Sequence, residues 1–369
     1  MAVIGAGVVG AAVAHRLAEK GVATLLLDRA EPGSGATGPS LGGVTAREQT
    51  RRDFFDLCVA AMAEYRRLAW KLAPAPWYHV DGALAWFRDP ASTAGLADRV
   101  QRLRSWGYAA EVLPARQVLS DLQPGLAITD PETPVAWFPD DAWVDPLAMT
   151  KRLVEGVRNA GGRVLTGPER EVLAIAVRGA RVASVTLRGG QTIPVAAVIN
   201  AAGVNADHVA ALVGRQLAVT TPRSLALYAE LPGGQEPVRR PLRTDHVFMR
   251  PDGPGRVMFV PQVDLGDAAP GPLPLDDPRV SESLAFATAA VPALADTRPV
   301  QAVIAGWPLL ANGLPCVGAV AEVPGYFEAV TDYGITLAPL IARSLADDVL
   351  GQARNPLLDP FRPGRSGEA

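Results

Sequence analysis

The chain has 369 residues, of which 49% are hydrophobic and 20% charged, with 35 basic and 38 acidic side chains. This length favours two domains, and the composition excludes a disordered chain, a collagen-like repeat and nucleic-acid binding driven by bulk charge. No apolar run reaches the roughly 18 residues of a membrane span, and the two cysteines, Cys58 and Cys316, give neither a disulfide framework nor metal-ligand spacing. We therefore expect a globular protein of the reducing cytoplasm.

The opening segment, residues 2–28, predicts a strand, a tight turn, a helix and a second strand. No basic residue precedes its apolar start, so it does not resemble a secretory signal, and a natural start upstream of Met1 stays open. Its turn reads Gly-x-Gly-x-x-Gly. In this spacing the first glycine permits the turn, the second lets a pyrophosphate approach the backbone, and the third lets helix and strand pack closely.

An acid closes the second strand of this unit. Asp28 lies 18 residues after Gly10, where it would accept hydrogen bonds from a ribose and disfavour NADP. The helix N-terminus would supply N–H groups to the phosphates. The residues assigned to dinucleotide binding here are Gly5, Gly7, Val8, Val9, Gly10, Asp28 and Arg29.

A glycine-rich loop over 32–43 and a long helix from Ala46 to about Leu72 come next. The stretch 73–145 is irregular, with strands near 80–87 and a helix near 93–105. Asp145 and Pro146 begin a helix that stops at the glycines 161–162. The remaining predicted elements are, in chain order, strands at 163–165, 171–177, 181–188 and 196–199, several strands over 223–310 with a helix near 281–290, a strand at 326–331 and a helix at 336–350.

Two further turns of small residues bear on which dinucleotide is bound. An NAD domain would continue as alternating strands and helices, whereas this chain proceeds to a glycine-rich loop and a meander of strands. Ala202 and Gly203, after a buried strand, are interpreted as a further wall of one long cofactor, which favours FAD. The helix that opens at Gly334, Ile335 and Thr336 would stabilise negative charge on a reduced flavin ring; an ordinary helix start capped by Thr336 is the alternative.

These signals lie at the beginning, middle and end of the chain, which predicts one domain assembled from separated segments. The predicted fold class is α/β, with a discontinuous Rossmann-like FAD-binding domain and an inserted α+β substrate domain built on a mixed β-sheet. The predicted boundaries are 1–75, 141–222 and 313–360 for the first domain, 76–140 and 223–312 for the second, and 361–369 for a flexible tail.

Taken together, the motifs resemble the FAD-dependent D-amino acid oxidase superfamily, in its branch of glycine oxidase, sarcosine oxidase and amino acid dehydrogenase. The resemblance spans nearly the whole chain and implies hydride transfer from an amine or amino acid to flavin N5. An imine forms and is hydrolysed, and oxygen or another electron acceptor reoxidises the flavin. It further implies that the backbone of Val172 meets the adenine. The motifs that carry it are the opening glycine turn, Gly42-Gly43, Val144-Asp145-Pro146, the segment 200–203, Pro315-x-x-Gly318 and the segment 334–337.

The chain departs from this family where the substrate would bind. Many members carry an Arg that holds the substrate carboxylate, and Trp307 occupies that position here. Arg250 is the best replacement, with Arg47 and Arg51 behind it; a solvated charge at a strand end is the alternative for Arg250. Aromatic residues of the two inserted regions would wall a pocket for a bulky or apolar amine, or else form core: Trp77, Tyr78, Trp86, Trp137, Phe138 and Trp143 in the first region, and Tyr228, Phe248 and Trp307 in the second. His246 is either a base or hydrogen-bond donor to the substrate or a surface histidine.

The lysines lie at positions 20, 71 and 151, so the active-site lysine of the sarcosine-oxidase-like members is missing, and Thr336 stands in its place. Cys316 lies past the position where some members attach the flavin, so we expect non-covalent FAD. One alternative function is a flavin subunit of a multi-subunit dehydrogenase, which passes electrons to a partner. Another is a flavin monooxygenase, which would need an NAD(P)H fingerprint that the sequence lacks. A homo-oligomer stays open.

Overall fold

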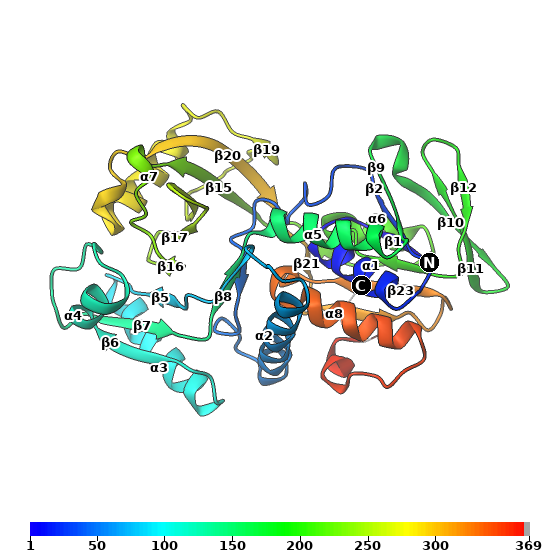
Figure 1. Ribbon diagram of the computed structural model, residues 1–369, viewed down its shortest axis with the longest axis horizontal. Coiled ribbons are helices and arrows are strands. Elements are labelled where there is room, and N and C mark those ends of the chain that lie inside the picture. The colour runs from blue at the N-terminus through cyan, green and yellow to red at the C-terminus, as the bar shows by residue number, and fades with distance from the viewer. Residues whose placement is uncertain (365–369) are drawn as a thin grey trace.

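The computed structural model describes residues 1–364 and contains two large sheets (Figure 1). The first has six strands in the order β22-β23-β13-β1-β2-β9, all parallel except the edge strand β22. Its strands are β1 (Ala2–Ile4), β2 (Leu25–Asp28), β9 (Arg163–Thr166), β13 (Val198–Asn200), β22 (Cys316–Ala319) and β23 (Tyr326–Val330).

Both faces of this sheet are covered, which explains its continuous apolar strands. Val3, Leu26 and Ile199 point to a core shared with the helices α1 (Val8–Glu19), α2 (Arg52–Lys71), α5 (Pro146–Asn159) and α8 (Gly334–Val349). Ile4 and Leu27 point the other way, to a sheet of three antiparallel strands. These are β10 (Val172–Arg178), β11 (Arg181–Leu187) and β12 (Thr192–Pro194).

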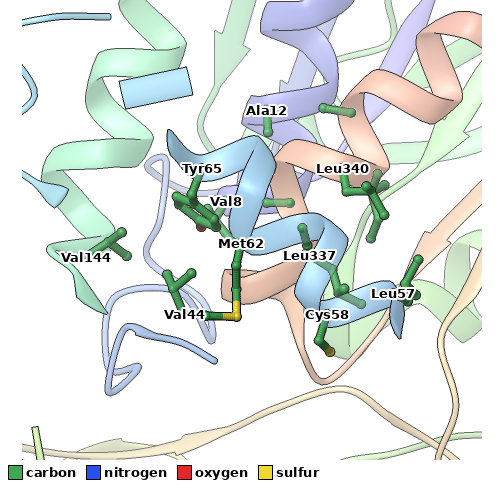
Figure 2. Packing of buried hydrophobic residues seen from close by; sticks show 14 of the residues in the cluster. Val8, Ala12, Val44, Leu57, Cys58, Met62, Tyr65, Val144, Leu337 and Leu340 are labelled. Carbon is green, nitrogen blue, oxygen red and sulfur yellow. The ribbon is translucent and has the colours of Figure 1, made fainter. Parts of the chain in front are cut away.

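Helix α2 adds a further layer to the helical side. Its Leu57, Cys58 and Met62 lie in one buried cluster with Val8 of α1 and Leu337 of α8 (Figure 2). Burying several such side chains contributes about 1.5–3 kcal/mol for each large one. This packing fixes the starts of α1 and α8 relative to each other.

The second large sheet is mixed, has nine strands and joins segments that are far apart in sequence. Its order is β19-β20-β15-β18-β17-β16-β5-β7-β6, with β5 and β16 paired in parallel. One face packs on α7 (Pro278–Ala290) through a second core. The strands are β5 (Ala83–Ala85), β6 (Glu111–Pro114), β7 (Pro134–Phe138), β15 (Arg223–Glu230), β16 (Leu242–Arg243), β17 (Val247–Pro251), β18 (Arg256–Pro261), β19 (Gly271–Pro272) and β20 (Arg298–Gly306).

Shorter elements complete the fold. Three strands form a small sheet, β3 (Gly43–Val44), β4 (Tyr78–His79) and β8 (Ala142–Val144), and two more pair as β14 (Val219–Thr220) and β21 (Leu309–Leu310). The remaining helices are α3 (Pro90–Ser105), α4 (Ala115–Gln117) and α6 (Ala206–Ala211), with a π turn at Val118–Leu122 and 3-10 turns at Pro168–Arg170, Gly203–Asn205, Pro232–Gly234, Pro292–Leu294 and Pro356–Phe361.

The predicted fold class is confirmed: a discontinuous Rossmann-like domain carries an inserted α+β part built on a mixed sheet (Figure 1). The exact domain boundaries stay a prediction. None of the helices within residues 1–364 is long and apolar enough to cross a membrane.

The predicted helix from Ala46 begins later, at Arg52 of α2. The segment before it is held as a loop, because Thr45 N donates to Thr336 Oγ1 at 3.3 Å and Arg47 N donates to Thr45 Oγ1 at 3.1 Å. These bonds replace the i to i−4 bonds of a helix.

The predicted flexible tail is also wrong where it is described. Phe361 is fully buried, with its ring centroid 5.6 Å from that of Phe54, and Arg362 pairs with Asp348 of α8. Residues 365–369 of the predicted tail lie outside the described residues.

Candidate functional site

A cavity of about 1030 Å³ lies at the carboxyl edge of the six-stranded sheet, where ligands bind in open parallel sheets. Its volume is at the upper end of the usual range for ligand sites. The turns after β1, β2, β13 and β23 line it, together with the loop 33–41, the start of β10 and one end of the nine-stranded sheet.

The glycine turn after β1 is required by close packing. Gly5 has φ +104°, and a Cβ there would lie 2.2 Å from Ala201 O. A Cβ on Gly10 would lie 1.8 Å from Gly5 O. Gly5 and Gly7 line the cavity, whereas Gly10 lies beneath them and serves helix packing. The turn therefore has the geometry that the spacing predicted, and its contact with a ligand stays a prediction.

The start of α1 also faces the cavity. Val8 and Val9 line it, and Val8 N donates to Thr37 Oγ1 at 3.0 Å. The N-cap residue Gly7 has no side chain to cap the helix. The N-terminus of a twelve-residue helix thus lies open toward the cavity, as phosphate binding requires.

Asp28 and Arg29 line the cavity beyond this helix. The Asp28 carboxylate accepts from Ala6 N at 2.6 Å and from Ala30 N at 2.9 Å, so it is already oriented. Arg29 pairs with Glu171 at 3.3 Å and donates to Asn205 Oδ1 at 3.2 Å. These residues make this part of the cavity polar. Val172, the predicted adenine contact, also lines the cavity.

Four of the other predicted cofactor residues, Ala202, Gly203, Gly334 and Ile335, line the cavity, and three do not. Gly42 has φ +75°, and a Cβ there would lie 2.3 Å from Val144 O. Thr336 Oγ1 donates to Gly43 O at 3.1 Å. Gly42, Gly43 and Thr336 therefore lie behind the wall and join the loop to α8.

These residues fit a flavin dinucleotide. The open helix N-terminus matches a pyrophosphate, the oriented carboxylate of Asp28 matches a ribose, and the turn at Gly334 starts α8, a sixteen-residue helix whose N-terminus favours negative charge. The cavity lining also includes residues of the second sheet, among them Ser224, Phe248 and Val260.

The second sheet supplies a largely apolar wall. Ser224 and Ala305 are register partners on β15 and β20, and Phe248 and Val260 are partners on β17 and β18. All four side chains line the cavity, as do Trp307 and Tyr333. The aromatic pocket predicted from the sequence is thus represented by Phe248 and Trp307, with Tyr333 in addition.

The structure does not bring Arg250 to this wall. Its side chain is 1% exposed and donates to Leu41 O at 2.9 Å, to Pro251 O at 2.6 Å and to Asp252 Oδ1 at 2.9 Å. These bonds engage Nε and Nη1 of the guanidinium, and Arg250 is not among the residues that line the cavity. The expected replacement for the missing Arg is corrected on this ground.

Tyr228 and His246 also lie away from the cavity lining. Tyr228 donates to Gly38 O at 2.9 Å, and burial raises the pKa of its hydroxyl to about 12. His246 is exposed and stacks on Phe286 of α7, with centroids 4.8 Å apart. Both side chains therefore contact other parts of the fold, and neither residue lines the cavity.

Arg47 and Arg51 are also placed elsewhere. Arg51 is exposed and pairs with Asp53 at 2.6 Å. Arg47 is buried and pairs with Asp141 at 2.6 Å, in a cluster with Glu48. Burial would raise the pKa of the Glu48 carboxyl, but the surrounding arginines, with Arg47 first, outweigh it and lower this pKa to about 2.

Asp332 is one of the charged cavity residues that the sequence did not predict; the others are Arg170, Glu171 and His208. Asp332 lies in the predicted turn between the last strand and the last helix, and an acid in such a turn is common enough to give no signal. Burial raises the pKa of its carboxyl to about 6, and hydrogen bonds from the backbone and Thr331 oppose this less strongly.

This raised pKa makes Asp332 a source of pH-dependent instability. Because the pKa exceeds the ordinary value of 3.8, the folded state binds more protons, and its stability falls as the pH rises from about 4 to about 6. We expect Asp332→Asn to match the wild type near pH 4 and to be about 1–3 kcal/mol more stable near pH 8. Urea unfolding of the FAD-free protein measures both values; an equal difference at the two pH values contradicts the prediction.

Comparisons with known proteins agree with this geometry. The chain is similar to an uncharacterized oxidoreductase, YurR, of Bacillus subtilis (strain 168), at 25% identity over 390 residues, which covers 98% of this chain and 97% of the relative. Glycine oxidase from Geobacillus kaustophilus has a similar structure, with a TM-score of 0.88, 22% identity, and 99% and 98% of the two chains covered. Iminodiacetate oxidase from Chelativorans sp. BNC1 gives a TM-score of 0.82 at 20% identity, with 98% of each chain covered.

The two structural likenesses show a shared fold. A family model described as FAD dependent oxidoreductase (DAO) matches residues 1–348, which is most of the chain. The matched residues include the glycine turn after β1, Asp28 at the end of β2, and the turn at Gly334 between β23 and α8. The protein is thus a flavin-dependent oxidoreductase, and the chain belongs to the FAD dependent oxidoreductase (DAO) family.

Proposed function

We propose that the chain binds FAD non-covalently in this cavity and oxidises the C–N bond of an amine or amino acid. The observation that carries the proposal is one continuous cavity with the dinucleotide contacts at one end and a largely apolar wall at the other. The names of the structural relatives, a glycine oxidase and an iminodiacetate oxidase, support nitrogen-bearing substrates. Non-covalent binding is supported by Cys316, which is buried and donates to Glu328 Oε2 at 3.0 Å away from the cavity lining.

Each group of residues has a distinct task in this proposal. Gly7 and the start of α1 hold the pyrophosphate, Asp28 holds the ribose, and the backbone around Gly334 and Ile335 supports the ring. Bound FAD supplies the acceptor for a hydride. The neutral amine loses its α C–H with the electron pair, the nitrogen lone pair forms C=N, and water later hydrolyses the imine. Phe248, Val260 and Trp307 exclude water and orient the C–H bond.

The proposal includes oxygen or another acceptor as the final oxidant, a cytoplasmic location and two domains with the boundaries given above. The expected substrate contacts at Arg250, His246 and Tyr228 are not part of it, since none of the three lines the cavity. Trp307 remains in the proposed substrate wall.

An anaerobic titration tests the proposal. The purified protein is mixed with a panel of amines and amino acids, and the oxidised-flavin absorbance band is followed. We expect protein that carries FAD and is bleached by at least one compound. A protein without FAD affinity would refute the proposal, and a yellow protein that no compound bleaches would favour the flavin subunit of a larger dehydrogenase.

A further inference from the structure

The charged side chains of the cavity are divided between its two ends. Among the described lining residues, five belong to the region of β2, the start of β10 and α6: Asp28, Arg29, Arg170, Glu171 and His208. The sixth, Asp332, follows β23. Since β13 and β1 lie between β23 and β2, the two ends are roughly 14 Å apart at the usual strand spacing.

Asp332 has no cationic partner in the described part of the chain. Its pKa is raised by burial, and the groups that oppose the rise are N–H groups of the backbone and the Thr331 hydroxyl, with no Arg or Lys among them. Burial raises the free energy of an ionised carboxylate that has no cationic partner, and binding of a cation lowers it again. The protein thus keeps an uncompensated carboxylate on the wall of its cavity.

The rest of this end is neutral. The wall is formed by Ser224, Phe248, Val260, Trp307 and Tyr333. Arg250, the nearest arginine along β17, is engaged by Leu41, Pro251 and Asp252 and is 1% exposed. Releasing it would remove an ion-pair partner from the half-buried Asp252 and a donor from two carbonyl oxygens.

From this charge distribution we propose that the substrate is an apolar amine without a carboxylate group, and that Asp332 holds its ammonium group. This inference rests on the proposed function. The apolar wall receives the hydrocarbon part of the amine, and the carboxylate of Asp332 accepts hydrogen bonds from the ammonium nitrogen. One ammonium proton then passes to this carboxylate, which leaves the neutral amine that transfers hydride. An α-amino acid would bring its own carboxylate toward Asp332, and two carboxylates in a partly buried site repel each other.

Matched pairs of compounds that differ by one carboxylate test the inference directly. We suggest 2-phenylethylamine with both enantiomers of phenylalanine, and 3-methylbutylamine with both enantiomers of leucine, each titrated anaerobically into the wild-type holoenzyme near pH 8. The perturbation of the oxidised-flavin spectrum gives Kd, and bleaching gives the rate of reduction. We expect each amine to bind on the order of 10- to 100-fold more tightly than its amino acids. Equal or tighter binding of the amino acids, or binding of neither member of any pair, overturns the inference.

The variant Asp332→Asn tests the assigned residue. The control is Asp276→Asn, which removes a negative charge at an exposed residue that does not line the cavity. We expect Asp332→Asn to keep its FAD, to lose on the order of 10-fold or more in amine affinity and to discriminate less between amine and amino acid. Suppose instead that Asp332→Asn loses FAD, or that it shifts the flavin reduction potential while the preference for amine over amino acid stays unchanged. The carboxylate then acts on the cofactor and not on the substrate, and the inference fails. The proposed function fails separately, when wild-type protein holds no FAD or no compound of the wider panel reduces it.

Discussion

Gly10→Ala is expected to abolish FAD binding and to lower the free energy of unfolding by about 3 kcal/mol or more. The new Cβ would lie 1.8 Å from Gly5 O and 3.3 Å from the Ala201 side chain. The clash is with backbone, so no side-chain rotation relieves it, and α1 must move away from β1. That movement displaces the helix N-terminus from the cavity. Flavin content by absorbance and urea unfolding of the FAD-free protein measure the two effects.

Gly95→Ala is the matched control for this substitution. Gly95 lies in α3, and a Cβ there meets no atom within 4 Å. Alanine is favoured over glycine inside a helix, so we expect this variant to keep FAD and to gain roughly 0.5–1 kcal/mol in stability. A Gly10→Ala protein that binds FAD and unfolds like the control would show that α1 can shift without loss of the site.

The Rossmann-like part of the fold was predictable because its signals are local. A strand, a glycine turn, a helix and an acid follow each other within residues 2–28, and each step depends on near neighbours. The start of the helix after the glycine-rich loop was not, because Thr45 is held by Thr336, which lies 291 residues further along the chain. A contact of that sequence separation leaves no periodicity to detect.

The substrate end was less predictable for a similar reason. Arg250 has the residue type that a carboxylate site needs, and only the structure shows that Leu41, Pro251 and Asp252 already accept its hydrogen bonds. Asp332 has the residue type of an ordinary turn, and its importance comes from burial at the cavity wall. The sequence can therefore identify a charged residue as a candidate for substrate binding. Whether its side chain is available to bind a substrate depends on its neighbours in the folded protein.

The cluster around Arg47 gives the second large effect. Arg47 and Asp141 form an ion pair of 2.6 Å whose side chains are 7% and 2% exposed, and Tyr108 donates to the same carboxylate. Burial raises the pKa of the Asp141 carboxyl, and Arg47 acts against this rise. The pair joins the loop before α2 to the turn before β8. The protein therefore depends on both charges being present together.

We expect Asp141→Asn to lower the free energy of unfolding by about 3 kcal/mol, because Arg47 would remain buried without its main counter-charge. The adjacent Asp140→Asn is the control. Its pair with Arg66 is 3.4 Å long, with side chains 54% and 56% exposed, so its loss changes stability by about 0.5 kcal/mol at most. Adding Arg47→Met to Asp141→Asn removes the unpaired charge and should recover part of the loss. Urea unfolding of the wild type, of the single variants Asp141→Asn and Arg47→Met and of the double variant measures the coupling; additive effects would show that the two buried side chains act independently.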